Sequence, residues 1–140
     1  MSKIRVIALG LVQDGDRLFV AEGYDAVKHD HFYRALGGGV EFGETSQAAL
    51  QREFQEEIQA ELTDITYLGC LENLFTYNGQ PGHELIQLYR CQFRDRSLYD
   101  RNEMLFRDGT EDWIKGLWIS RDRCLSGELH LVPPACLTYL

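Results

Sequence analysis

The sequence has no long apolar run and none of the signals of a membrane or secreted protein. Apolar residues make up 44% of its 140 residues, but the apolar opening from Ile4 to Val12 is far too short to cross a bilayer. This opening also lacks the small-residue cleavage site of a signal peptide and runs into Asp14 and Asp16. We therefore expect no membrane partner and a cytoplasmic location.

Basic residues are also scarce, with 14 Lys and Arg against 22 Asp and Glu and a net charge of -8. Such a charge repels a long nucleic acid unless basic residues gather on one face, and the sequence shows no such gathering. Small phosphorylated ligands remain compatible with it, because a bound divalent cation reverses the local sign of the field.

Cysteine and histidine are present, but not in the spacing of a zinc site. The four cysteines form no CxxC or Cys/His pattern with the four histidines. We expect buried thiols and a reducing compartment, with the cysteines at Cys70, Cys91, Cys124 and Cys136.

Only three prolines occur, and there is no repeat, low-complexity run or linker, which predicts one domain over residues 1–140. Residues 25–31 and the charged segment Asp95 to Asp112 are expected to be loops, the second long enough to be functional. A short helix is expected at Arg121–Leu125. Alternation and turn residues predict strands at Ile4–Gln13, Arg17–Gly23, Phe32–Leu36, Ile65–Leu71, Asn73–Tyr77, Glu84–Phe93 and Ile114–Ile119.

One helix is clearly predicted after the glycines at positions 37–39, which we expect to form a loop that exposes its backbone. Thr45 or Ser46 can cap its first turn, and a buried stripe recurs every four residues at Leu50, Phe54 and Ile58. This amphipathic helix should pack on a sheet, which makes the fold α/β.

Acidic residues are concentrated around this helix, in the segment GGVEFGETSQAALQREFQEEIQA from Gly38 to Ala60. Glu53 precedes Glu56 and Glu57 by three and four residues, so the three carboxylates project from one side of the helix. Clustered hard oxygens without His or Cys suit Mg²⁺ or Mn²⁺. Three glutamates alone more often form an ordinary solvated face, but the residues around them indicate a site.

The segment resembles the Nudix box, the family pattern GX5EX7REUXEEXGU in which U is a bulky apolar residue. The matching residues are Gly38, Glu44, Arg52, Glu53, Phe54, Glu56 and Glu57. Gln59 stands in the position of the last glycine and Ala60 in that of the last apolar residue. We expect the helix to end differently from that of the family, or to run slightly longer, because the family glycine suits a left-handed cap.

The resemblance implies a Nudix-like α/β/α sandwich with a central mixed sheet and a hydrolase of a nucleoside diphosphate linked to another group. It implies metal ligands at the Gly37 carbonyl and at Glu53, Glu56 and Glu57. Arg52 and Glu44 would orient the site. The general base varies in the family, and we favour Glu111 over Asp112, Glu103 and Asp108.

Substrate recognition is less clearly indicated. Arg34, just before the glycines, can contact phosphate, and a ring or basic side chain at Tyr33, Phe75, Tyr77 or His83 can stack on a base or pair with a phosphate. Core packing is the ordinary role of each aromatic residue.

Three other functions remain open at this point. They are a nucleotide-sensing Nudix-fold binding module, an isomerase of a small diphosphate, and a structural domain that binds a divalent cation. The intact glutamates disfavour the first, and the second lacks a cysteine near the box. The resemblance also leaves a homodimer open.

Overall fold

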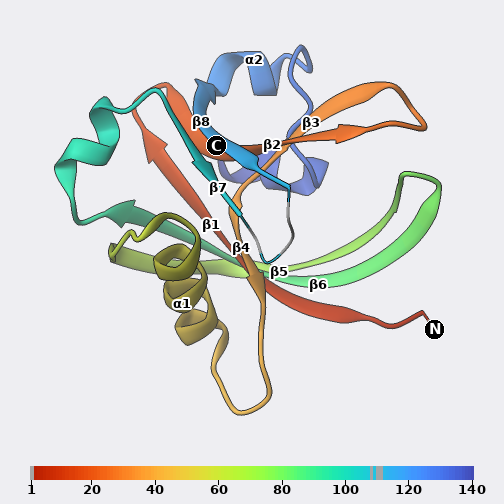
Figure 1. The fold of residues 1–140 in the computed structure, drawn as a ribbon, viewed down its shortest axis with the longest axis horizontal. Coiled ribbons are helices and arrows are strands. Elements are labelled where there is room, and N and C mark those ends of the chain that lie inside the picture. The colour runs from red at the N-terminus through yellow and green to blue at the C-terminus, as the bar shows by residue number, and fades with distance from the viewer. Residues whose placement is uncertain (1, 108, 110–111) are drawn as a thin grey trace.

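A computed structural model describes residues 2–107, 109 and 112–140, and in this part of the chain one mixed sheet lies between helices (Figure 1). Its eight strands run in the order β5-β6-β1-β2-β8-β7, with β3 paired to β2 and β4 paired to β1. The strands are β1 (Arg5–Asp14), β2 (Arg17–Asp25), β3 (Asp30–Arg34), β4 (Leu36–Gly39), β5 (Leu62–Tyr77), β6 (Gln80–Phe93), β7 (Glu103–Phe106) and β8 (Ile114–Ser120).

The centre of the sheet is the parallel pair β1 and β6, and the other pairs are antiparallel. Successive side chains of β1 point to opposite faces, so that Ile7 and Leu9 enter one core while Ala8 and Val12 enter the other. Both faces are therefore covered, which explains why β1 is apolar without alternation.

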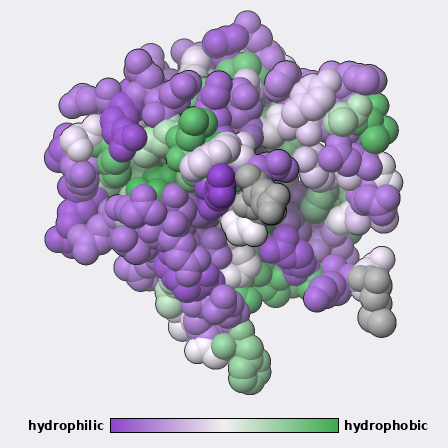
Figure 2. Space-filling model, viewed as in Figure 1, coloured by the Kyte–Doolittle hydropathy of each residue, from purple (hydrophilic) through white to green (hydrophobic). Residues whose placement is uncertain are grey.

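Helix α1 (Ser46–Ile58) covers one face of the sheet. The Thr45 hydroxyl accepts a hydrogen bond from the Ala48 amide, and Leu50, Phe54 and Ile58 are buried. The predicted start and stripe are thus confirmed. The outer side of α1 is hydrophilic (Figure 2), as an amphipathic helix on a sheet requires.

The end of α1 differs from our expectation. Gln59 itself takes the left-handed cap conformation with φ 52°, and its amide donates to the Gln55 and Phe54 carbonyls. The predicted different or later end is therefore wrong. Packing of Ile58 and Ala60 into the core holds this conformation against a cost of about 1 kcal/mol for a residue with a Cβ.

The other face is covered by α2 (Arg121–Leu125) and the 3₁₀ helix η2 (Pro134–Tyr139), through Cys124 and Cys136. The predicted α/β/α sandwich with a mixed sheet is confirmed, as is the short helix at Arg121–Leu125. Within the described ranges, no helix has the length and apolarity needed to cross a bilayer.

Several predicted boundaries are wrong. The glycines at positions 37–39 belong to β4 and not to a loop, because β1 supplies backbone partners to them. The two strands predicted at 65–71 and 73–77 are one strand, β5, bent by bulges. Residues 95–112, expected to be irregular, include the 3₁₀ helix η1 (Arg96–Asp100) and β7. β3 begins at Asp30, inside a predicted loop.

The expected burial of the cysteines holds for three of the four. Cys91, Cys124 and Cys136 are buried, whereas Cys70 is exposed, so the prediction of a buried thiol is wrong there.

Candidate functional site

The candidate site lies where β4 leaves the sheet and the chain turns into α1. Gly37 and Gly38 pair with Leu9 and Ala8 of β1. A Cβ on Gly37 would lie 1.9 Å from the Ala8 carbonyl oxygen, and its φ of 147° also favours glycine. Glycine therefore lets β4 lie close against β1 at the entrance to the site.

Gly38 brings the backbone against the carboxylate of Glu53. A Cβ at Gly38 would lie 2.5 Å from the Glu53 Cδ and 2.6 Å from its Oε2. Glu53 retains 19% exposure of its side chain. Since no side chain stands between them, the carboxylate and the backbone around Gly38 can approach one bound cation or phosphate together.

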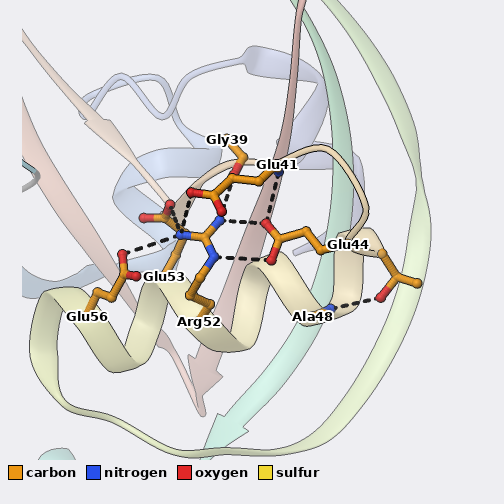
Figure 3. Close-up of polar contacts among 8 residues, drawn as sticks. Gly39, Glu41, Glu44, Ala48, Arg52, Glu53 and Glu56 are labelled. Carbon is orange, nitrogen blue, oxygen red and sulfur yellow. Dashed lines mark hydrogen bonds and ion pairs between the residues drawn. The ribbon is translucent and has the colours of Figure 1, made fainter.

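Arg52 joins the loop to the helix through a set of polar contacts (Figure 3). Its Nη2 donates to Glu44 Oε1 at 2.6 Å and to the Gly39 carbonyl at 2.9 Å, and its Nε donates to Glu44 Oε2 at 3.2 Å. Its Nη1 donates to Glu53 at 2.9 Å and to Glu56 at 3.3 Å. The forked guanidinium thus holds three carboxylates and one backbone oxygen.

The charges of this cluster stabilise one another. The hydrogen bond from Arg52, together with one from the Glu41 amide, holds the pKa of the Glu44 carboxyl below its ordinary value. The hydrogen bonds from Arg52 to Glu44 and Glu53 in turn raise the pKa of the Arg52 guanidinium. Both shifts favour the charged forms of Glu44 and Arg52, so this ion pair holds the loop against the helix.

The donor set fits a hard divalent cation. Glu53 and Glu57 are half-buried on one side of α1, and Glu56 is exposed one turn from Arg52. Among the residues that the structure describes, no group of three acidic, histidine or cysteine side chains is gathered as a closed metal cage. Magnesium prefers a few carboxylates completed by water and phosphate oxygens, so an open set of this kind suits it. The ligand assignments stay predictions.

Gly38→Ala should lower activity by about 10- to 100-fold, because the added methyl group must displace the Glu53 carboxylate. Gly39→Ala is the matched control, since its Cβ would meet only the Arg5 guanidinium, at 3.4 Å. Steady-state kinetics of both variants and their thermal unfolding would check this. Equal losses in the two variants would contradict a specific role of the Gly38 contact.

The predicted substrate residues fall into separate places. Phe75 and His83 line one groove beside the N-terminal segment. Tyr77 instead packs edge to face on Phe32, with ring centroids 5.6 Å apart. Tyr33 is half-buried, its backbone bonds to the C-terminal segment at His130, and burial raises its pKa.

Arg34 donates to the carboxylate of Glu84, which is only 3% exposed and also accepts from Asn73 at 3.2 Å. Its guanidinium is therefore held in place and partly exposed. Its predicted contact with phosphate stays a prediction.

The predicted general bases are also separated. Glu111 and Asp108 lie outside the described residues. Glu103 sits on β7 with its carboxylate 3.8 Å from Lys115 Nζ across the strand pair, and Asp112 is exposed. None of these placements assigns the base.

The sequence did not indicate four groups that lie in or beside the site. They are the Gly39 carbonyl and three side chains that line a neighbouring hollow, those of Lys3, Arg5 and Glu84. The Gly39 carbonyl joins the site by accepting from Arg52, and Arg5 lies opposite Glu84 in the parallel register of β1 and β6. Gly37 and Gly39, on either side of Gly38, were the one indication in the sequence that backbone groups would take part in the site. Nothing in the spacing of residues 5 and 84 indicated that their strands would be parallel neighbours.

Comparisons with known proteins give a family match for the sequence. The model of the NUDIX domain family matches residues 1–132. No curated protein matches the sequence significantly.

Three solved structures share the fold at low sequence identity. A NUDIX hydrolase from Nitrosomonas europaea is 17% identical, with a TM-score of 0.63 over 94% of this chain and 82% of its own. A MutT protein from Bacillus halodurans is 16% identical, with a TM-score of 0.63 over 96% and 79% of the two chains. A MutT NUDIX hydrolase from Burkholderia pseudomallei is 19% identical, with a TM-score of 0.62 over 86% of both.

Proposed function

The chain belongs to the NUDIX family, and on that premise we propose that it hydrolyses a phosphoanhydride bond in a nucleoside diphosphate linked to another group. Family membership supports pyrophosphohydrolase activity in general. The nucleotide substrate, the metal dependence and the residue roles below are our proposals. Four free cysteines, three of them buried, suit the reducing cytoplasm in which we place the protein.

One observation carries the proposal: Arg52 holds the loop and the glutamates of α1 in one arrangement beside a backbone that lacks side chains. An isolated acidic helix would need no such support. Holding oxygen ligands in place before a substrate arrives is what hydrolysis of a diphosphate requires, because the catalysis is mostly positioning and charge stabilisation.

Magnesium or manganese, when bound by Glu53, Glu56, Glu57 and the Gly37 carbonyl, would polarise phosphoryl oxygens and lower the pKa of the attacking water. Arg52 and Glu44 do not react. They keep the Glu53 carboxylate turned toward the glycine backbone, so that the ligand positions are set by the fold.

In the reaction, a new bond forms between the water oxygen and one phosphorus, and the bridging bond from that phosphorus to its leaving phosphate oxygen breaks. A carboxylate accepts the proton of the water. Glu111 is our proposed base, although Glu53 and Glu57 can also serve. The products are a nucleoside monophosphate, or a similar phosphate, and the phosphorylated remainder.

A panel of nucleotide sugars, dinucleoside polyphosphates, ADP-ribose-like compounds and nucleoside triphosphates, each with Mg²⁺ or Mn²⁺, tests this function. We expect release of a monophosphate from at least one class, with the activity abolished by a chelator. Binding without turnover of any compound would instead indicate the nucleotide-sensing module. Metal uptake without nucleotide binding would indicate a structural domain.

A further inference from the structure

A groove runs beside the N-terminal segment, away from the glutamates of α1. Residues 2–4 form one wall, and the end of β5 and the start of β6 form the other, with an open space of about 520 Å³ between them. A second hollow of about 380 Å³ shares Lys3, Phe75 and His83 with it and continues to Arg5 and Glu84. Figure 1 shows the start of β1 beside the β5–β6 hairpin. The size is typical of a site for a small molecule.

The groove is cationic, although the protein as a whole has a net charge of -8. Lys3 and Arg5 are exposed, and no ion pair among the described residues involves either one. The acidic side chain in the groove, Glu84, is already bound by Arg34. Two positive charges therefore remain for an anion from solution.

The groove also contains an aromatic surface. Phe75 lies directly across from Gly82 in the strand pair, and a Cβ on Gly82 would lie 2.3 Å from the Phe75 ring. Glycine therefore lets the ring lie across the neighbouring strand, with the His83 imidazole next to it along the groove. An aromatic ring beside two cations can bind a nucleotide, with the base stacked on the ring and the phosphate paired with the cations.

The hairpin that forms one wall is held in place before any ligand binds. The Asp25 carboxylate, 4% exposed, accepts hydrogen bonds from the Asn78 amide at 3.1 Å and from the Lys28 amide at 2.9 Å. The Asn78 side chain accepts in turn from the Ala26 amide at 2.8 Å. These bonds join the β2–β3 turn to the β5–β6 turn, so this wall of the groove is preformed.

One end of the groove reaches the catalytic loop. Arg5 lies opposite Glu84 in the register of β1 and β6, and its Nη2 lies 3.4 Å from the position of a Cβ on Gly39. The Gly39 carbonyl accepts from Arg52 at 2.9 Å. Gly38 faces Glu53 and Gly39 faces Arg5, so the glutamates and the groove lie on opposite sides of β4. Among the described strands β4 pairs only with β1, so an extended ligand that passes its other edge would have its diphosphate at the glutamates and its far end in the groove.

We propose, on the basis of the hydrolase function above, that this groove binds the second nucleotide of a dinucleoside polyphosphate. The phosphates near that nucleotide pair with Lys3 and Arg5, and its base stacks on Phe75. A nucleotide sugar would bind less well, because a neutral sugar leaves both cations without a countercharge and the ring without a stacking partner.

Calorimetry on the Glu57→Gln protein with Mg²⁺ tests the groove without turnover, using diadenosine tetraphosphate and ADP-glucose as probes. We expect diadenosine tetraphosphate to bind at least about tenfold more tightly than ADP-glucose. Adding Lys3→Gln and Arg5→Gln should weaken diadenosine tetraphosphate by about 10- to 100-fold and remove most of this preference. The control protein carries Arg94→Gln and Arg101→Gln, which change the net charge by the same amount at exposed sites outside the groove. It should keep the preference for diadenosine tetraphosphate.

An unchanged preference after the Lys3 and Arg5 substitutions would overturn the inference, as would equal binding of the two probes or no binding of diadenosine tetraphosphate. Assays of hydrolysis by the wild type distinguish failure of the proposed hydrolase function from failure of the groove assignment. If the wild type hydrolyses other diphosphates, only the groove assignment falls. If it hydrolyses none while the groove retains its preference, only the hydrolase assignment falls.

Discussion

Glu57→Gln should lower kcat by about 10²- to 10⁴-fold on whichever diphosphate the wild type hydrolyses, with little change in thermal stability. Glutamine has almost the same shape as glutamate but removes one negative charge and one hard oxygen from the half-buried side of α1. Steady-state kinetics across a range of Mg²⁺ concentrations, with circular dichroism to verify the fold, would measure this effect.

Glu61→Gln is the matched control, because Glu61 lies beyond the end of α1 and its 70% exposed side chain pairs with the exposed Arg94. The same chemical change there should leave kcat nearly unchanged. Full activity of the Glu57 variant would show that the site has been assigned to the wrong glutamate, and an equal loss in the Glu61 variant would reveal a general effect of charge.

Arg52→Met should lower both stability and activity. It leaves the carboxylates of Glu44 and Glu53, each 19% exposed, without their shared countercharge. We expect a loss of about 2–3 kcal/mol in the free energy of unfolding, below the range for fully buried pairs because water still reaches the site. Activity should fall by about 10- to 100-fold, since the ligands lose their support. Urea denaturation and steady-state kinetics would measure the two effects.

Two further variants separate geometry from charge in this prediction. Arg52→Lys keeps the charge but not the fork that reaches Glu44 through two nitrogens, so it should recover only part of each loss. Arg123→Met breaks an exposed pair with Glu128 and should change the free energy of unfolding little. Full recovery by lysine would mean that charge alone, and not the forked contact, supports the loop.

The helix and its carboxylates could be predicted because their information is local. Thr45 caps the first turn, the apolar stripe repeats with the helical period, and Glu53, Glu56 and Glu57 follow the same period on another side. The pairing of Arg52 with Glu44 also followed, through the family pattern. The end at Gln59 was predicted wrongly, because local preference disfavours its left-handed conformation and core packing around it overrides that preference.

The strand boundaries near the site could not be predicted from local pattern. Gly37 and Gly38 look like loop residues, and they form a strand only because β1 offers backbone partners at close range. The short strand β7 lies in a charged segment and depends on β8 for its hydrogen bonds. In both places a distant strand decides the conformation.

By itself, the sequence determined helix α1, its acidic side and the family pattern, since neighbouring turns of one helix bring those residues together without help from the rest of the chain. Only the tertiary structure decided that residues 3 and 5 lie beside residues 75 and 83 in one groove that reaches Gly39, just before α1. The physical reason is that strand pairing joins backbone groups far apart along the chain, and the side chains on those strands carry no mark of which partner they will meet.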